Sequence, residues 1–458
     1  MMGRMAREET RTMTSTPGSA PAAHRTPPTA TRAWTTRLLV VGIVLSALNL
    51  RPAITSLGAL LEEVRDGLGM SGSLAGLLTS VPPLCFAVFG VMAPRLARRF
   101  GPGAVVCAGM AAITAGLLIR PYAGGTAGFL AASALALMGI AVSNVLMPVI
   151  VKQWFPDRVG SMTGLYSMAL ALGTSAAAAV TVPMTKALGG SWQSGLAVWA
   201  GLAAAAVLPW IPFVRHGGAP SGEGPDGRRV PARGAASVER PDGMRPDVQR
   251  PDGRRESGRG APAALRITRS RTAWALAVFF GLQATAAYIT MGWMPQIFRD
   301  AGVAAGTAGL LLAVTMVMGV PLAFVIPRVA TRLPHQGPIV LVLGVCGLAG
   351  YAGLYLAPAG GAWAWAVLLG VANCAFPLAL TMVGMRAGTG AGVAQLSAFA
   401  QSTGYLISIP GPLLVGVLYQ HSGGWGLPIA LMAGLMIPQM AVGVLAGRDR
   451  TVEEEAAR

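Results

Sequence analysis

Charged side chains are scarce in this sequence, and long stretches of it have none. Only 12% of the 458 residues are Asp, Glu, Lys or Arg, whereas 53% are hydrophobic. Ala104–Ile119 and Leu341–Leu356 carry no charge at all. A soluble domain cannot bury that much apolar surface, whereas a membrane-spanning helix needs about 20 mostly apolar residues. The shortage of charge therefore excludes an ordinary soluble fold and predicts a membrane protein.

Cysteine is also rare, and paired reactive side chains are missing. The four cysteines all lie inside apolar stretches, without the spacing of metal ligands or of a disulfide framework: Cys85, Cys107, Cys346 and Cys374. The net charge of +17 comes from arginines in loops and linkers, with no aromatic-interleaved patch, which argues against a nucleic-acid partner. No apolar stretch pairs His, Asp, Ser or metal ligands. We therefore expect no enzyme, no metal site and no cofactor.

Twelve apolar segments account for most of the chain. They cover approximately 38–61, 72–94, 103–120, 126–151, 160–185, 193–214, 272–297, 305–327, 337–357, 361–386, 392–418 and 424–446. The sequence predicts an all-α membrane protein with twelve transmembrane helices in two six-helix halves, at 36–215 and 271–447.

Three segments are too polar or too short to cross a membrane. Residues 1–35 are rich in Thr, Pro, Ala and Arg and lack the apolar core of a signal peptide, so they are predicted to form a disordered cytoplasmic tail. Residues 216–270 repeat Arg-Pro-Asp at Arg240, Arg245 and Arg250, and are predicted to form a flexible cytoplasmic linker. Residues 448–458 are expected to be a charged cytoplasmic tail.

The positions of the basic residues predict the orientation. With both termini in the cytoplasm, all but five of the 35 lysines and arginines fall on the cytoplasmic side. The five exceptions are Arg51, Arg65, Arg120, Lys186 and Arg299. This asymmetry satisfies the positive-inside rule, so we expect a multi-pass protein of the cell membrane with cytoplasmic termini.

The two halves share a sequence repeat at an offset near 233 residues. Ala75-Gly76-Leu77-Leu78 matches Ala308-Gly309-Leu310-Leu311, and Pro94-Arg95-Leu96-Ala97 matches Pro327-Arg328-Val329-Ala330. Asn144-x-x-x-Pro148 matches Asn373-x-x-x-Pro377 at an offset of 229. Since six is an even number, both copies enter the membrane the same way up. Parallel six-helix repeats joined by a long loop are the plan of the major facilitator superfamily, with a substrate cavity between the halves.

Arg51 is the main candidate for substrate binding, because it lies within the first apolar segment. A central arginine costs about 2.5–3.5 kcal/mol to insert, so a function is the default hypothesis. No Asp or Glu lies in the interior of any apolar segment, so Arg51 has no predicted acidic partner at its depth. Its planar guanidinium suits a carboxylate-like anion. Two alternatives stay open. Arg51 could have a structural role, bound to backbone carbonyls or to an acid such as Glu62, or it could have a gating role.

Polar residues in other segments complete the predicted site. The candidates for substrate binding are Asn49, Thr55, Asn144, Gln283, Tyr288, Trp293, Asn373, Gln401 and Tyr405. Interhelical hydrogen bonding alone would also explain any one of them. Arg95 and Arg99 are candidates for a gate in the loop between the second and third helices. Pro148 and Pro377 are candidates for kinks that serve gating, or for static bends.

Several motifs resemble one family within that superfamily. Asn49-Leu50-Arg51-Pro52-Ala53-Ile54-Thr55 looks like the signature of the cyanate transporter and nitroimidazole exporter family. Lys152-Gln153-Trp154-Phe155-Pro156, Trp293-Met294-Pro295 and Gln401-Ser402-Thr403-Gly404-Tyr405-Leu406 are also similar to that family. One feature departs from the wider superfamily: the acidic residue usual before the gate loop is absent between Gly90 and Pro94. The resemblance implies small anions or small nitrogen compounds as substrates.

These observations favour a secondary active transporter of a small anion or weak acid, which works by alternating access with Arg51 as the substrate anchor. The substrate would be cyanate-like or another small organic or nitrogen compound. A proton-coupled exporter of drugs or toxic compounds is the alternative, although such exporters usually hold a membrane-embedded carboxylate and none is visible. A membrane sensor that binds without transport is a third reading. We expect a monomer whose partners are its substrate, the bilayer and, if transport is proton-coupled, protons.

Overall fold

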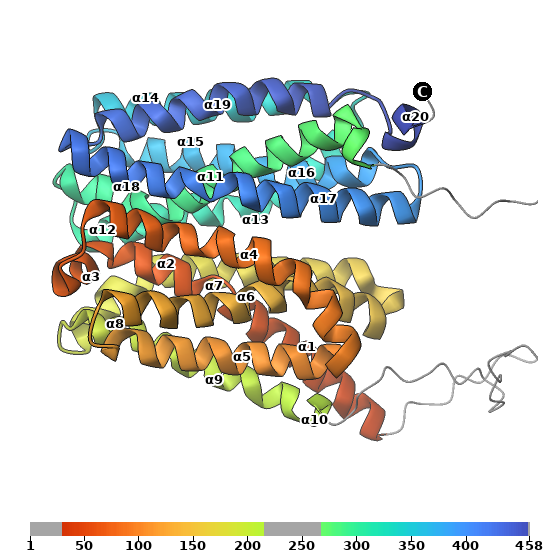
Figure 1. Ribbon diagram of the computed structural model, residues 1–458, viewed down its shortest axis with the longest axis horizontal. Helices are drawn as coiled ribbons and strands as arrows, with labels where there is room; N and C mark the ends of the chain where they lie inside the picture. Colours follow the sequence, from red (N-terminus) through yellow and green to blue (C-terminus); the bar gives the residue numbers. More distant parts are fainter. Residues whose placement is uncertain (1–29, 215–266, 457–458) are drawn as a thin grey trace, which may run out of the picture.

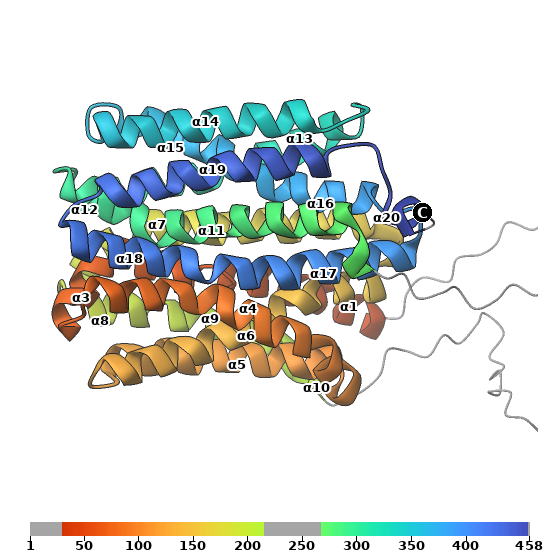
Figure 2. The same cartoon turned by 45° about the horizontal axis from the view of Figure 1, so that its top comes forward.

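The computed structural model describes residues 30–214 and 267–456. Within these ranges, twelve helical segments are long and apolar enough to cross a membrane, which confirms the predicted twelve-helix all-α fold. The helices run side by side along one direction (Figures 1 and 2). Residues 1–29 of the predicted tail, and the part of the predicted linker that carries the three Arg-Pro-Asp repeats, lie outside the described residues.

The N-terminal half contains the first six spans. They are α1 (Ala30–Asn49) with α2 (Pro52–Ala59), α4 (Gly72–Phe100), α5 (Pro102–Ile119) with η1 (Arg120–Tyr122), α6 (Thr126–Trp154), α7 (Val159–Ala187), and α8 (Trp192–Ala197) with α9 (Trp199–Val207), η3 (Leu208–Trp210) and α10 (Ile211–Val214). The short helices α3 (Leu61–Leu68) and η2 (Pro156–Arg158) connect spans.

The C-terminal half contains the other six. They are α11 (Arg271–Asp300), α12 (Ala305–Val317) with α13 (Gly319–Ala330), α14 (Gly337–Leu356), α15 (Ala362–Asn373) with α16 (Ala375–Met385), α17 (Gly390–Ser408) with α18 (Pro410–Ser422), and α19 (Gly426–Ala446). The short helix η4 (Ile267–Arg269) precedes α11, and α20 (Val452–Ala456) follows the last span.

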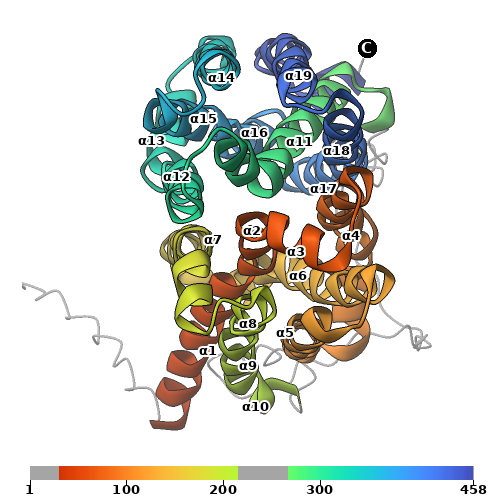
Figure 3. The ribbon, with the colours of Figure 1, turned by 90° about the vertical axis from the view of Figure 1, so that its left-hand side faces the viewer.

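The two halves lie against each other as separate bundles, which Figure 3 shows end-on. One end of the molecule carries the short helix α3, and we call it the α3 end. The opposite end carries α20 and the beginning of α1, and we call it the α20 end (Figure 1). Because α11 begins beside η4 and ends near α3, it runs from the α20 end to the α3 end.

The repeated Ala-Gly motif lies where the halves meet. A Cβ atom added to Gly76 in α4 would lie 2.8 Å from the carbonyl oxygen of Leu413 in α18. A Cβ atom added to the matching Gly309 in α12 would lie 2.5 Å from the carbonyl oxygen of Ala178 in α7. Each half therefore uses the same glycine of its repeat to bring its backbone close to the other half, as small residues do at helix interfaces in membranes.

The first span is broken at its centre. The helix α1 ends at Asn49, α2 begins at Pro52, and Arg51 adopts non-helical φ and ψ angles of −125° and −26°. Proline has no N–H and disfavours helical geometry in the preceding residue, so Pro52 explains the break. A second break separates α15 from α16 at Cys374, three residues before Pro377. Pro148, in contrast, lies inside the continuous helix α6.

Both predicted tails contain ordered helix where they are described. The helix α1 begins at Ala30, inside the segment predicted as a disordered tail. The helix α20 lies in the predicted C-terminal tail, and its Val452 is buried. The amide of Val452 donates to the carbonyl of Arg386 over 2.9 Å. A charged stretch is therefore folded where its side chains find partners on the helix bundle, which hydropathy alone does not reveal.

Candidate functional site

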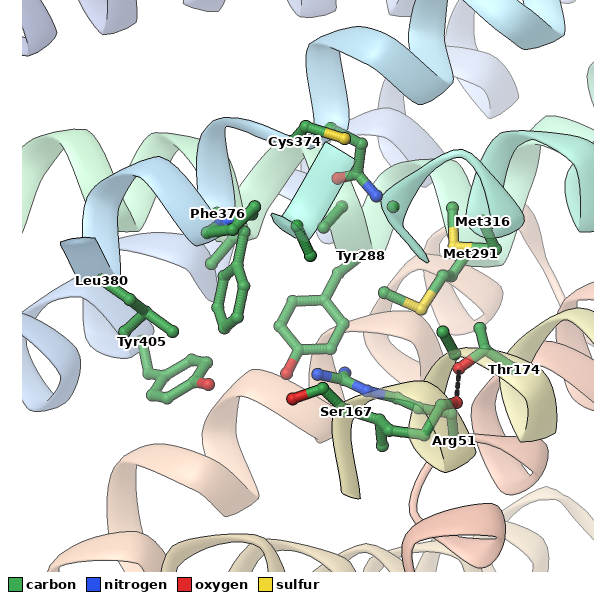
Figure 4. A pocket seen from close by; sticks show the side chains of 18 residues that line it. Arg51, Ser167, Thr174, Tyr288, Met291, Met316, Cys374, Phe376, Leu380 and Tyr405 are labelled. Atoms are coloured by element: carbon green, nitrogen blue, oxygen red, sulfur yellow. Dashed lines mark hydrogen bonds between the residues drawn. The ribbon is translucent and has the colours of Figure 1, made fainter. Parts of the chain in front are cut away.

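A cavity of about 260 Å³ lies between the two halves (Figure 4). Arg51 and α7 line it from the N-terminal half, and α11, α12, α13, α15, α16 and α17 line it from the other half. Its polar and aromatic lining residues are Arg51, Ser167, Thr174, Tyr288, Asn373, Phe376 and Tyr405. The lining residues Ser167, Ala323 and Leu380 lie in the halves of their membrane spans that are nearer the α20 end. The cavity therefore extends from the middle of the bundle toward the α20 end.

Arg51 supplies the positive charge of this cavity. The break before Pro52 interrupts the helix at Arg51, and its guanidinium lies among the cavity residues (Figure 4). Among the described residues, no carboxylate forms an ion pair with it. The Tyr288 hydroxyl, from the other half, lies against the guanidinium (Figure 4). The Tyr288 hydroxyl oxygen can accept a hydrogen bond from the guanidinium, and no carboxylate of the described residues cancels the charge of Arg51.

Aromatic rings border the arginine. The Arg51 guanidinium lies 5.9 Å from the centre of the Phe86 ring. The Phe86 ring stacks on Tyr405, with centroids 5.0 Å apart and planes 26° apart. Tyr405 meets Phe280 edge-on at 5.2 Å, and Phe280 packs against Phe376 at 5.5 Å. These aromatic rings present flat π faces beside the Arg51 guanidinium, an arrangement that suits a planar ligand.

An amide network fixes Asn373 at the cavity wall. The side-chain amide of Gln283 donates to the Asn373 side-chain oxygen over 2.9 Å and to its backbone carbonyl over 3.0 Å. Gln439 in α19 donates to the Gln283 oxygen over 2.9 Å. Gln283 therefore holds α11, the end of α15 and α19 together, and it satisfies carbonyls that the helix break at Cys374 would leave unpaired.

Two candidates on the first span face away from the cavity. The Asn49 amide donates to the carbonyls of Leu45 and, over 3.1 Å, Leu202, and so ties the first span to the sixth. The Thr55 hydroxyl donates to the carbonyl of Arg51 over 3.2 Å. This carbonyl also accepts from the backbone amides of Ile54 and Thr55, so the Thr55 hydroxyl adds a further bond at the start of α2. Both side chains are buried and neither lines the cavity.

Three further candidates lie around the cavity without lining it. Asn144 accepts a hydrogen bond from the Tyr166 hydroxyl over 2.7 Å. Trp293 is fully buried and donates to the Thr79 hydroxyl over 3.2 Å. Gln401 donates to the Ser397 hydroxyl over 2.7 Å. Of the residues proposed for gating, Pro377 lines the cavity, whereas Arg95, Arg99 and Pro148 are exposed elsewhere.

The halves are joined at the α3 end. Arg299 at the end of α11 forms ion pairs with Glu62 (2.7 Å) and Glu63 (2.9 Å) of α3. The Trp293–Thr79 hydrogen bond crosses the same interface, deeper in the bundle. We call the set Arg299, Glu62 and Glu63 the α3 latch. It joins α11 of one half to α3 of the other at this end.

The sequence analysis did not identify several side chains that shape the site. Tyr166, Phe86 and Phe376 were not singled out, since an aromatic residue in an apolar segment gives no signal of its own. Arg120 was placed at the outer end of the segment 103–120 and was not named as a site residue, but it is only 2% exposed. The motif Arg120-Pro121-Tyr122 stands at the end of an apolar segment. A charged residue followed by proline at that position is typical of a turn exposed to solvent, so the sequence gives no sign that Arg120 is buried.

The fold and the cavity are those of a membrane transporter with two parallel halves. A family model described as "Major Facilitator Superfamily" matches residues 39–396, and the chain belongs to this family. It is 33% identical to the uncharacterised transporter YycB of Bacillus subtilis, over 90% of this chain and 94% of that one. It is 30% identical to the 2-nitroimidazole transporter of Escherichia coli, over 91% and 96% of the two chains.

Two further comparisons agree. The chain is 28% identical to the cyanate transport protein CynX of Escherichia coli, over 87% of this chain and 95% of that one. The solved structure of the nucleoside transporter NupG has the same fold, with a TM-score of 0.67 and 12% identity over 90% and 98% of the chains. These relatives confirm the predicted family and the expectation of a transporter instead of an enzyme.

Proposed function

We propose that this protein is a secondary active transporter of a small planar anion or weak acid, with Arg51 as the substrate anchor. The observation that carries the proposal is an arginine in a cavity between the halves, with no carboxylate paired to it in the described part of the chain. The substrate supplies the missing negative charge, and Tyr288, Asn373 and Tyr405 contact it. The other predicted site residues, namely Asn49, Thr55, Asn144, Gln283, Trp293 and Gln401, hold these groups in place.

The names of the relatives support a planar substrate. Cyanate and 2-nitroimidazole are both small, flat and nitrogen-containing, although one is a linear ion and the other a ring. The cavity of about 260 Å³ has room for either compound. The guanidinium binds oxygen or nitrogen lone pairs, and the rings of Tyr405 and Phe376, which line the cavity, cover the flat faces.

We infer that the α20 end faces the cytoplasm, as the positive-inside rule predicts. The α3 latch then closes the outer side, and the cavity opens inward. Transport requires a second state in which the latch opens and the α20 end closes. Arg95 and Arg99 lie at the α20 end of α4, where such closure would occur. Pro148 and Pro377 lie in the spans that must bend.

A proton-coupled exporter finds less support. The cavity lining contains no Asp or Glu among the described residues, and the nearest membrane-edge carboxylates, Glu62 and Glu63, are paired with Arg299. Proton movement with the substrate remains compatible with transport of a weak acid, because the proton can travel on the substrate itself.

Purified protein in liposomes tests the function directly. We expect saturable uptake of radiolabelled cyanate that protein-free liposomes lack, with 2-nitroimidazole as a competitor. Repeating the assay with an imposed proton gradient separates proton-coupled transport from exchange. Binding without any flux would contradict the proposal and indicate a sensor.

A further inference from the structure

A second arginine, Arg120, is buried between the helices near the α3 end. Only 2% of it is exposed. Its Nη1 donates to the carbonyl of Ala53 over 3.0 Å, and its Nη2 lies 3.5 Å from the Ser56 hydroxyl. Its Nε has no hydrogen-bond partner, and no carboxylate of the described residues pairs with it. The guanidinium lies 6.0 Å from the centre of the Phe129 ring, but no carboxylate of the described residues balances its charge and its Nε donor is unpaired.

A small cavity of about 20 Å³ lies beside this guanidinium. Arg120, Ser133 and Thr79 supply its polar lining, together with Tyr288 from the opposite half. The Ser133 hydroxyl is buried and also lacks a hydrogen-bond partner. Buried polar groups are nearly always paired, so two unpaired donors at one cavity point to a missing acceptor.

The two cavities follow each other along the interface between the halves. Tyr288 lines both of them. On α11, which runs toward the α3 end, residues from Ala284 to Met291 line the larger cavity, and the smaller one reaches Gly292. On the first span, which runs the same way, Arg51 lines the larger cavity and residues from Ala53 to Gly58 line the smaller one. The smaller cavity therefore lies on the α3 side of Tyr288, in line with the route that alternating access would open.

Close backbone contacts keep this second cavity small. A Cβ atom added to Gly58 would lie 2.0 Å from the carbonyl oxygen of Met291, and one added to Gly292 would lie 2.7 Å from the side chain of Thr79. Both contacts join one half to the other. A volume of about 20 Å³ holds one water-sized group. Separation of the halves at the α3 end would remove both contacts and enlarge the cavity around Arg120.

We propose that Arg120, with Ser133 and Ser56, forms a second binding site for a small monovalent anion on the α3 side of Tyr288. This site is filled when the halves separate at the α3 end, and it passes the anion to Arg51 or receives it from there. The proposal rests on the proposed function, because it assigns the outer half of the same transport route. A purely structural role would not need an arginine, since a glutamine amide can also donate to the carbonyl of Ala53.

The test is thiocyanate binding to the purified full-length protein in detergent, with sodium gluconate keeping the ionic strength constant. Arg299→Gln serves as the parent protein, because loss of the α3 latch populates the state in which the Arg120 site is open. We expect Arg51→Gln and Arg120→Gln each to raise the Kd of this parent at least tenfold. Thiocyanate binding should remain measurable in each single variant, and the combination of the two should abolish it.

A matched pair of serine variants guards against misfolding of Arg120→Gln. Ser133 and Ser80 both carry a buried, unpaired hydroxyl, but only Ser133 lines the small cavity. In the Arg299→Gln, Arg51→Gln protein, Ser133→Ala should weaken thiocyanate binding about threefold, and Ser80→Ala should leave it unchanged.

Two results would overturn the second site. One is complete loss of thiocyanate binding in Arg51→Gln with no effect of Arg120→Gln, and the other is equal affinity of the two serine variants. A different result would contradict the proposed transport function without contradicting the second site. A protein that binds thiocyanate through Arg120 but moves no anion across liposomes would contradict transport and leave the second site standing.

Discussion

The hydroxyl of Tyr288 lies against the guanidinium of Arg51, and the two residues belong to opposite halves of the molecule (Figure 4). The contact therefore joins the halves at the centre of the bundle, at the charge that is proposed to hold the substrate. A substrate anion bound to Arg51 would compete with this contact or share it. In both cases, substrate binding at Arg51 would change the Tyr288–Arg51 contact that joins the two halves.

Tyr288→Phe should weaken substrate binding about tenfold and leave the fold intact. The change removes one hydrogen bond to a charged group, which contributes about 1.5–3 kcal/mol, and keeps the ring. The measurement is the KM for cyanate uptake in proteoliposomes. Tyr351→Phe is the matched control, because Tyr351 is equally buried but lies outside the cavity. Equal KM values for the two variants would remove Tyr288 from the site.

Arg299→Gln should shift the protein toward the state that is open at the α3 end. Its two ion pairs are lost in that variant, and a partly exposed pair contributes about 0.5 kcal/mol, so the total of about 1 kcal/mol gives about a fivefold change in population. A cysteine introduced at Leu57, inside the closed interface, reports the change through its rate of labelling by a membrane-impermeant thiol reagent. Lys186→Gln, which removes an exposed charge at the same end, should not alter the labelling rate. Faster labelling in the lysine variant alone would contradict the latch.

Asn49→Ala should destabilise the protein without changing the KM. Its amide joins two spans through the carbonyl of Leu202, and such hydrogen bonds are worth about 0.6–2 kcal/mol in membranes. Thermal unfolding of the purified protein and cyanate uptake separate the two effects. A raised KM with unchanged stability would instead place Asn49 in direct contact with the substrate.

Glu455 should hold α20 to the bundle in a pH-dependent way. Its carboxylate accepts hydrogen bonds from the hydroxyls of Ser270 (2.6 Å) and Thr272 (2.7 Å) and from the Thr272 amide (3.1 Å). Burial alone would raise the pKa of Glu455, but these bonds outweigh it and hold the pKa below its usual value. A lowered carboxyl pKa stabilises the folded state above the unfolded pKa of about 4.3, and the effect is lost as the pH falls through the folded pKa.

Glu455→Gln should therefore lower the hydrogen-exchange protection of the Val452 amide about fivefold at pH 7, the equivalent of about 1 kcal/mol. The difference from the wild type should shrink as the pH falls through the lowered folded-state pKa of Glu455, because the wild-type carboxylate then becomes neutral as well. Glu454→Gln is the control, because Glu454 contacts only Thr451 within its own helix turn. A difference that persists at low pH would show that the charge of Glu455 is not responsible.

Hydropathy and the repeat were sufficient to predict the twelve spans and the two related halves, since bilayer thickness constrains every span in the same way. Arg51 was also found from sequence, because a charge inside an apolar segment is conspicuous. Arg120 was not, because it lies just past the end of its helix and becomes buried only when α2 packs over it. The role of Asn49 could not be read either, since the direction of a side chain depends on neighbouring helices.

The central claim is that Arg51 holds the substrate through its charge and its planar fork. Uptake of radiolabelled cyanate by proteoliposomes should be compared for the wild type, Arg51→Ala, Arg51→Lys and the exposed control Arg332→Ala, at equal amounts of inserted protein. We predict that Arg51→Ala lowers uptake by a factor of about 30 or more, as loss of a buried charge partner does, that Arg51→Lys recovers little of it, and that Arg332→Ala matches the wild type. Wild-type uptake by Arg51→Ala would contradict the account.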